Sequence, residues 1–281
     1  MARRNRVLIA GMSIEIGVIL PTSTPDPAQH ILGDVRESAR FAEEIGLDSV
    51  WSTDHLVATA PMLDSTVVLA TAAAVTERIT VGFNVMLLSL RPVAWVAKQV
   101  STLQYVSGDR LVLGVGTGNP AHGDIGWRAV GMSYADRGPR TDAALRVLPD
   151  LVTGKRTVLD DGVDVTLSPG SAMPPVVVAG NARAALRRAA TYGDGWVSIG
   201  LSPEKIAVGL AEIGRLAAKQ GRPAIKATIV GPDVDTDPQR ATAHLAAYEA
   251  AGAERVILAP TGAGWRRDYE FAARLRASYN N

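Results

Sequence analysis

The 281-residue chain contains no cysteine. Disulfides, thiolate metal sites and cysteine nucleophiles are therefore excluded, and the composition suits a reducing cytoplasm, the location we expect. An excess of charge of one sign is also lacking, because 29 basic residues stand against 28 acidic ones and the net charge is +1. This balance offers no electrostatic basis for binding nucleic acid or an anionic membrane surface, so the expected ligands are small molecules.

Long apolar runs are missing too, and no segment approaches the roughly 18 consecutive apolar residues of a membrane helix. The arginines before Val7–Met12 imitate a signal peptide, but the apolar stretch is too short for one. Met12 is a candidate natural start, with residues 1–12 treated as a candidate appended arm. We expect one domain over residues 1–281, because barrel domains reach about 250 residues.

The sequence does contain short, continuous apolar runs that alternate with segments of helical spacing. Such runs are typical of parallel strands covered on both faces by helices. The alternation occurs eight times and predicts an α/β fold, a (β/α)8 TIM barrel. The expected strands are 14–20, 48–53, 79–86, 111–113, 175–179, 195–199, 226–231 and 255–259, and the expected helices are 35–45, 65–75, 92–106, 141–152, 183–192, 203–220, 238–251 and 265–277. Lys155–Ser168 is predicted to be a short inserted hairpin that turns at Asp161-Gly162.

A glycine-rich loop follows the fourth predicted strand. Gly114, Gly116 and Gly118 remove side chains at alternate positions, so a flat ring system or a neighbouring strand can approach the backbone; tight packing of the strand end is the alternative. A dinucleotide-binding fingerprint is not fulfilled, because Asn119 replaces its third glycine and Pro120 continues the loop where a helix should begin.

In a barrel of this kind the active site lies at the C-terminal ends of the strands. Polar residues follow several of these ends and should converge on one cavity: Asp54, His55, Asn84, Thr117, Asn119 and Asn181. His30 and His244 are isolated, with no second ligand at metal spacing, so we expect no metal site.

Three segments, Glu37–Leu56, Ile79–Pro120 and Pro174–Trp196, resemble in order and spacing the bacterial luciferase-like oxidoreductases, in particular their coenzyme F420-dependent branch. The resemblance implies hydride transfer between the deazaflavin F420 and a small organic substrate. FMN is the alternative cofactor, because the scaffold holds either. One rival function is an FMN-dependent monooxygenase that receives reduced flavin from a separate reductase, and another is a non-catalytic flavin-binding protein. A homodimer is also implied.

The resemblance assigns roles to the residues nearest the ring of the cofactor. Asp54-His55 is similar to the pair that meets the ring, and the histidine is proposed there as general base, which suits a side chain that titrates near neutral pH. Asn84-Val85 matches the place of a strand bulge with a cis peptide bond behind the ring. If Asp54 and His55 have no such role, Asp54 caps a short helix and His55 packs against the loop.

Two further motifs are assigned to the rest of the cofactor. Thr117-Gly118 resembles a pair that contacts it. Gly180-Asn181-Ala182 resembles the turn before a helix whose free N–H groups hold its phosphate, and the unpaired donors of a helix N-terminus suit this role.

The chain departs from the F420-dependent glucose-6-phosphate dehydrogenases at two positions. Their proton-donating glutamate is Asn119 here, and an aromatic residue after the histidine is Thr59. Asn119 cannot exchange a proton near neutral pH, so we expect it to line the pocket beside His55 without that chemistry. His122 and Asp124 could substitute, or could be solvated loop residues. Trp127 is a candidate wall of the substrate pocket or a core residue.

Overall fold

The computed structural model describes residues 14–23, 33–232, 235, 237–262 and 264–279. The candidate N-terminal arm and His30 lie outside the described residues. None of the helices in these ranges is long and apolar enough to cross a membrane.

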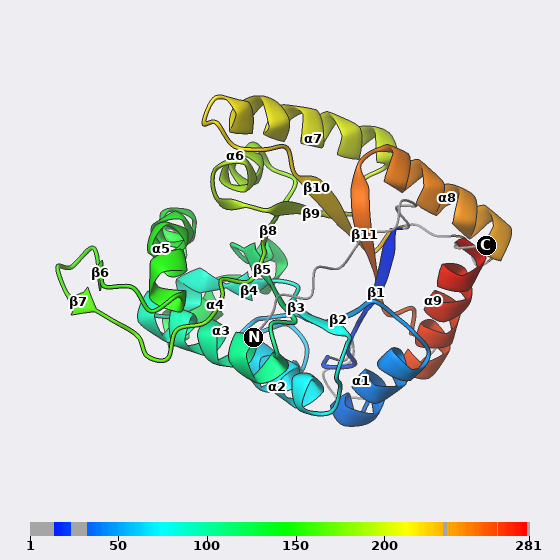
Figure 1. Cartoon of the computed structure of the whole chain (residues 1–281), viewed down its shortest axis with the longest axis horizontal. Coiled ribbons are helices and arrows are strands. Elements are labelled where there is room, and N and C mark those ends of the chain that lie inside the picture. The colour runs from blue at the N-terminus through cyan, green and yellow to red at the C-terminus, as the bar shows by residue number, and fades with distance from the viewer. Residues whose placement is uncertain (1–13, 24–32, 233–234, 236, 263, 280–281) are drawn as a thin grey trace, which may run out of the picture.

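The strands form a closed parallel barrel, as predicted (Figure 1). Around the barrel the order is β3-β2-β1-β11-β10-β9-β8-β5, and pairing of β5 with β3 closes the ring. The predicted contact between the first and last strands is confirmed, with Glu15 opposite Arg255. The barrel strands are β1 Glu15–Ile19, β2 Ser49–Ser52, β3 Thr80–Phe83, β5 Leu111–Gly116, β8 Val176–Ala179, β9 Gly195–Ile199, β10 Lys226–Val230 and β11 Ala253–Leu258.

The third barrel strand is interrupted. β3 ends at Phe83, the chain leaves the ladder at Asn84–Val85, and β4 (Met86–Leu87) pairs with the C-terminal half of β5. The single strand expected over residues 79–86 is therefore two short ones. This break lies at the position where the resemblance predicted a bulge.

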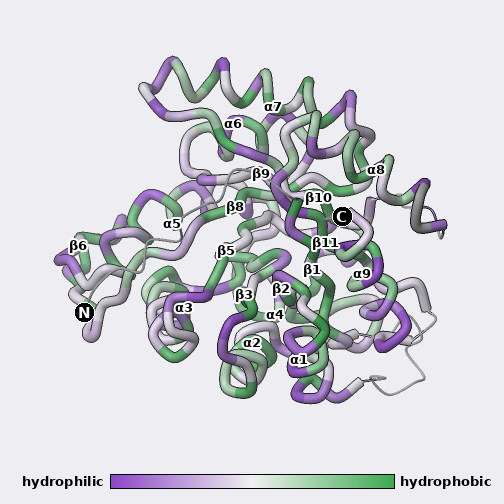
Figure 2. The backbone as a smooth tube through the Cα atoms, turned by 45° about the vertical axis from the view of Figure 1, so that its right-hand side comes forward, coloured by the Kyte–Doolittle hydropathy of each residue, from purple (hydrophilic) through white to green (hydrophobic). Residues whose placement is uncertain are grey.

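Helices cover the outside of the barrel (Figures 1 and 2). α2 begins as expected, because the Asp64 carboxylate accepts the N–H of Val67. α5 begins at Arg137, four residues before the predicted start. Pro139 lies in its first turn, where a proline is tolerated, so it does not delay the start of the helix. The helices are α1 Val35–Glu44, α2 Ser65–Ala74, α3 Val93–Ser107, α4 Ile125–Ala129, α5 Arg137–Val152, α6 Arg183–Tyr192, α7 Pro203–Ala218, α8 Pro238–Ala250 and α9 Trp265–Tyr279, with 3-10 turns η1 Leu88–Leu90 and η2 Pro120–His122.

The inserted hairpin was predicted correctly. β6 (Thr157–Val158) pairs antiparallel with β7 (Asp164–Val165), and the hairpin projects beyond α5 at the side of the barrel (Figure 1). The helix α4, in contrast, was not expected. It has only five residues and its N-cap side chain makes no capping hydrogen bond, so the sequence carries little signal for it.

A tryptophan fills the inside of the barrel. Trp51 is fully buried among valines and an isoleucine from the other strands, and its indole N–H donates to Ser49 Oγ at 2.8 Å. The guanidinium of Arg255 lies 5.5 Å from the ring centre. Glycine makes room for this ring, because a Cβ at Gly82 would lie 2.3 Å from Trp51 Cε3.

This packing predicts that Gly82→Ala destabilises the protein. The added methyl would overlap the rigid indole, and overpacking of a core costs about 1–3 kcal/mol. Gly214→Ala is the matched control, because it lies within α7 with nothing within 4 Å of its Cβ position. Helix propensity predicts that this control gains about 0.5–1 kcal/mol. Urea unfolding measures both, and equal midpoints for the two variants would contradict the packing described here.

Candidate functional site

A cavity of about 560 Å³ lies at the C-terminal ends of the barrel strands. Ligand pockets fall in this size range and, in barrels, at this end. The predicted site residues Asp54, His55, Asn84, Val85, Thr117, Gly118, Asn119, Gly180 and Asn181 all line it. Ala182 is not among the lining residues. The polar strand ends named from the sequence therefore do converge.

Asp54 is buried below the cavity, and its carboxylate is fully engaged. Arg91 donates to both oxygens, at 2.7 and 2.8 Å, and the Ser65 hydroxyl and the Leu87 N–H each donate at 2.9 Å. Burial disfavours the charge on Arg91, but its bonds to Asp54 outweigh that and raise its pKa. The carboxylate thus fixes the loop after β2 against β4 and η1, and it places the next residue, His55.

His55 and His122 lie against each other within the cavity. Their ring centres are 4.2 Å apart and their planes meet at 64°. The pKa of His55 is lowered, first by burial and then by the neighbouring His122, against the opposing charge of Asp54. His122 was named from the sequence with solvation as its alternative. The structure places it, half-buried, among the residues that line the cavity, and its role in catalysis stays a prediction.

The Asn84–Val85 peptide bond is cis, as the resemblance implied. Val85 then packs on the neighbouring strand: a Cβ at Gly116 would lie 2.4 Å from Val85 Cγ2, and one at Gly114 would lie 2.0 Å from the Phe83 carbonyl oxygen. The close approach of a neighbouring strand, one of the interpretations of these alternating glycines, is therefore confirmed, and contact of a flat ring with them stays a prediction.

Gly118 has a different neighbour. Its φ is +92°, and a Cβ there would lie 2.5 Å from Trp127 Cη2. Trp127 is buried below the loop, and its indole N–H donates to Ser89 Oγ at 3.1 Å. It does not line the cavity, so its interpretation as a wall of the substrate pocket was wrong and the core alternative holds.

Asn119 lines the cavity, but its carboxamide oxygen accepts the N–H of Ala121 at 3.0 Å. This bond caps the η2 turn, in which the His122 N–H donates to the Asn119 carbonyl. The side chain therefore shapes the turn that carries His122. Its predicted contact with substrate stays a prediction.

The turn before α6 is held by bonds to β9. The Asn181 carboxamide donates to the Ile199 carbonyl at 2.9 Å, and the Trp196 indole donates to the Gly180 carbonyl at 2.8 Å. Gly180 has φ +125°, which favours glycine. Ala182, the N-cap of α6, is exposed and provides no capping side chain. The first N–H groups of α6 thus keep their capacity to bind an anion.

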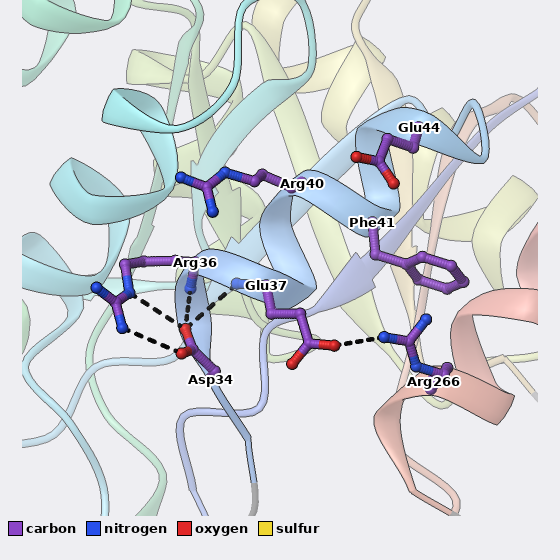
Figure 3. A pocket seen from close by; sticks show the side chains of 7 residues that line it. All are labelled: Asp34, Arg36, Glu37, Arg40, Phe41, Glu44 and Arg266. Carbon is purple, nitrogen blue, oxygen red and sulfur yellow. Dashed lines mark hydrogen bonds and ion pairs between the residues drawn. The ribbon is translucent and has the colours of Figure 1, made fainter.

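Figure 3 shows a second pocket, of about 520 Å³, between α1 and α9. Four of its charged side chains form two pairs, in which Asp34 binds Arg36 and Glu37 binds Arg266. It lies on the outer helical layer, away from the strand ends, and gathers no set of groups suited to catalysis.

The sequence matches the family described as luciferase-like monooxygenase over residues 14–279. The chain belongs to this family. An uncharacterized protein of Mycobacterium tuberculosis is 35% identical over 167 residues, which are 58% of this chain and 57% of that protein. The F420-dependent hydroxymycolic acid dehydrogenase of the same organism is 28% identical over 244 residues, covering 76% and 66%. This chain therefore spans little more than half the length of the mycobacterial relative of unassigned role.

Solved structures confirm the luciferase-like barrel. An F420-dependent secondary alcohol dehydrogenase, in complex with an F420-acetone adduct, matches 96% of this chain and all of that chain with a TM-score of 0.80 at 16% identity. The FMN-bound oxygenating constituent of 3,6-diketocamphane monooxygenase from Pseudomonas putida matches 93% and 97% with a TM-score of 0.76 at 15% identity. The relatives are thus oxidoreductases and monooxygenases.

The sequence reasoning missed Arg91. The sequence did carry a signal, because Arg91 directly follows the largely apolar segment of β4 and η1 and precedes Pro92. An arginine in such a segment is buried only where its charge has a partner. The contact of His122 with Thr59 left no such signal, since 63 residues separate the two.

Removing Arg91 should leave the Asp54 carboxylate buried and unpaired. Breaking a buried pair in this way costs about 3–5 kcal/mol, so we expect Arg91→Met to lower the free energy of unfolding by that order. Asp54→Asn combined with Arg91→Met should recover part of the loss. The control is Arg36→Met, whose pair with Asp34 is exposed to solvent (Figure 3) and should leave the urea midpoint nearly unchanged. Similar midpoints for Arg91→Met and Arg36→Met would show that the buried pair does not hold the loop.

Proposed function

We propose that this protein is an F420-dependent oxidoreductase that transfers a hydride between the deazaflavin and a small organic substrate. The observation that carries the proposal is the cavity of about 560 Å³ at the strand ends, which gathers His55, Asn84–Val85, Thr117–Gly118 and Gly180–Asn181. Relatives named as F420-dependent dehydrogenases, 28% and 32% identical, support it. At these identities, substrate and cofactor are part of the proposal.

The residues present suit such a cofactor. The cavity is lined by small or apolar groups from the third barrel strand, β5 and β8, including Val85, Gly116 and Ala179, and such a surface suits contact with a flat ring. Asn84–Val85 would support that ring from one side and Thr117–Gly118 would contact it. The uncapped N-terminus of α6 would hold the phosphate, because its donors and its dipole favour an anion.

When bound, the deazaflavin accepts or releases the hydride. The chain supplies the remaining functions. His55, placed by the bonds of Asp54, would take the proton of an alcohol at a ring nitrogen. Its lowered pKa keeps the imidazole neutral, and so able to accept that proton, at neutral pH. The loops after β2 and β5 meet where Thr59 contacts His122, which lines the cavity.

A second candidate is an FMN-dependent monooxygenase supplied with reduced flavin by a separate reductase. The observation that favours it is the family itself, which includes 4-hydroxyprotoasukamycin monooxygenase of Streptomyces nodosus, 28% identical over 203 residues. A non-catalytic flavin-binding protein remains the third alternative. A cytoplasmic location stays a prediction.

Titration of the purified protein with F420 and with FMN, side by side, tests the proposal. We expect F420 to bind more tightly, and Gly180→Val to weaken that binding by about tenfold or more, equal to about 1.4 kcal/mol. Gly221→Val is the control, because Gly221 also has a positive φ, +67°, but lies in open space after α7. Tight binding of FMN alone would favour the monooxygenase, and binding of neither would contradict the cofactor assignment.

We also propose that two copies pair through α2 and α3. Val67 on α2 is 67% exposed, and Trp95 and Tyr105 on α3 are 65% and 72% exposed, an apolar surface that contact with a second copy would bury. Sedimentation at micromolar concentration should show a dimer that Trp95→Glu converts to the 29.5 kDa monomer. Val208→Glu, at an equally exposed position on α7, should leave the dimer intact. A monomeric unmodified protein would contradict this proposal.

A further inference from the structure

The imidazole of His122 is held by the loop that follows β2. The backbone N–H of Thr59 donates to His122 Nδ1 at 3.2 Å, and the Thr59 hydroxyl lies at the same distance from that nitrogen. The η2 turn, capped by Asn119, fixes the backbone of His122 from the other end. The ring and the backbone of His122 are thus both positioned by hydrogen bonds within the protein.

The bond from Thr59 determines where the proton of a neutral His122 lies. A backbone N–H can only donate, so Nδ1 must be the acceptor and the ring hydrogen must be on Nε2. Nε2 has no hydrogen-bond partner among the residues that the structure describes. His122 therefore presents one N–H donor that no described residue accepts.

His55 gives this donor a complementary neighbour. With the ring centres 4.2 Å apart, positive charge on both rings at once would be disfavoured by repulsion, and the pKa of His55 is lowered by burial and then by His122. Among the described residues that line the cavity, the only other titratable group is Asp54, whose carboxylate is bound by Arg91, Ser65 and the Leu87 N–H. The pair thus combines a fixed donor with a neutral ring that can accept a proton.

We propose that His122 is a second catalytic residue, whose Nε2–H binds the reacting oxygen of an alcohol or carbonyl substrate while His55 exchanges the proton. This inference rests on the proposed function. In alcohol oxidation the C–H bond breaks with both electrons, which leave as hydride to the oxidised deazaflavin, and the O–H bond breaks with its proton passing to His55. The resulting carbonyl oxygen stays bound to the His122 N–H. Reduction reverses each step.

Two substitutions of His122 distinguish the role of its Nε2–H donor from the role of its bond with Thr59. His122→Gln can place an N–H donor near the position of Nε2, whereas His122→Asn can still accept from Thr59 but offers no group there. We expect His122→Asn to lower kcat for 2-propanol or larger secondary alcohols by about 10²–10³-fold, the typical loss for one oxyanion donor, and His122→Gln to recover most of it. The affinity for F420 should change little in either variant.

The imidazole nitrogens can be observed without cofactor or turnover. Nitrogen NMR of histidine-labelled protein should show His122 with its hydrogen on Nε2. The pKa of His55 should rise in His122→Asn, because a like-charged neighbour is lost. A hydrogen on Nδ1, or unchanged kcat in His122→Asn with an active parent protein, would overturn the role of His122 alone. A parent protein that binds F420 but oxidises none of these alcohols would overturn this inference and leave the cofactor assignment intact; failure to bind F420 would overturn both.

Discussion

The buried ion pair of Asp54 and Arg91 is the interaction on which the geometry of the cavity depends. A charge away from water is costly unless every oxygen or N–H finds a partner. Here both carboxylate oxygens are satisfied, by Arg91, by the start of α2 and by the backbone of β4. These bonds join three separate segments below the cavity. His55 follows Asp54 directly, so the same bonds set the position of the imidazole.

The rest of the barrel divides into a structural part and a functional part. Trp51 and the valines around it fill the interior, and glycine is required where the indole meets β3. Above this core the third barrel strand is broken at Asn84–Val85, and Val85 occupies the space that the glycines of β5 leave free. The glycines of β5 therefore allow Phe83 and Val85 to pack closely against that strand. A ligand in the cavity would contact the surface that this packing forms.

Much of this could be predicted from the sequence, because the repeated alternation of apolar runs and helical segments specifies a parallel barrel, and a barrel brings strand ends together. That rule, together with the family resemblance, placed Asn84, Thr117 and Gly180 at the cavity. Contacts between distant loops had no local signal. His122 contacts Thr59 and His55 only because two loops converge. The ring of Trp127 lies below the loop, outside the cavity, and packs against Gly118, where a side chain would overlap it.

The family resemblance alone does not distinguish between the two candidate cofactors, because barrels of this fold hold F420 in some solved structures and FMN in others. We propose that the cavity at the strand ends holds a deazaflavin ring beside His55. A crystal structure of the protein with oxidised F420 tests this proposal most directly. We expect the ring between His55 and Asn84–Val85, with the phosphate at the start of α6. A ring bound anywhere else, or a phosphate held away from Gly180–Ala182, would contradict it.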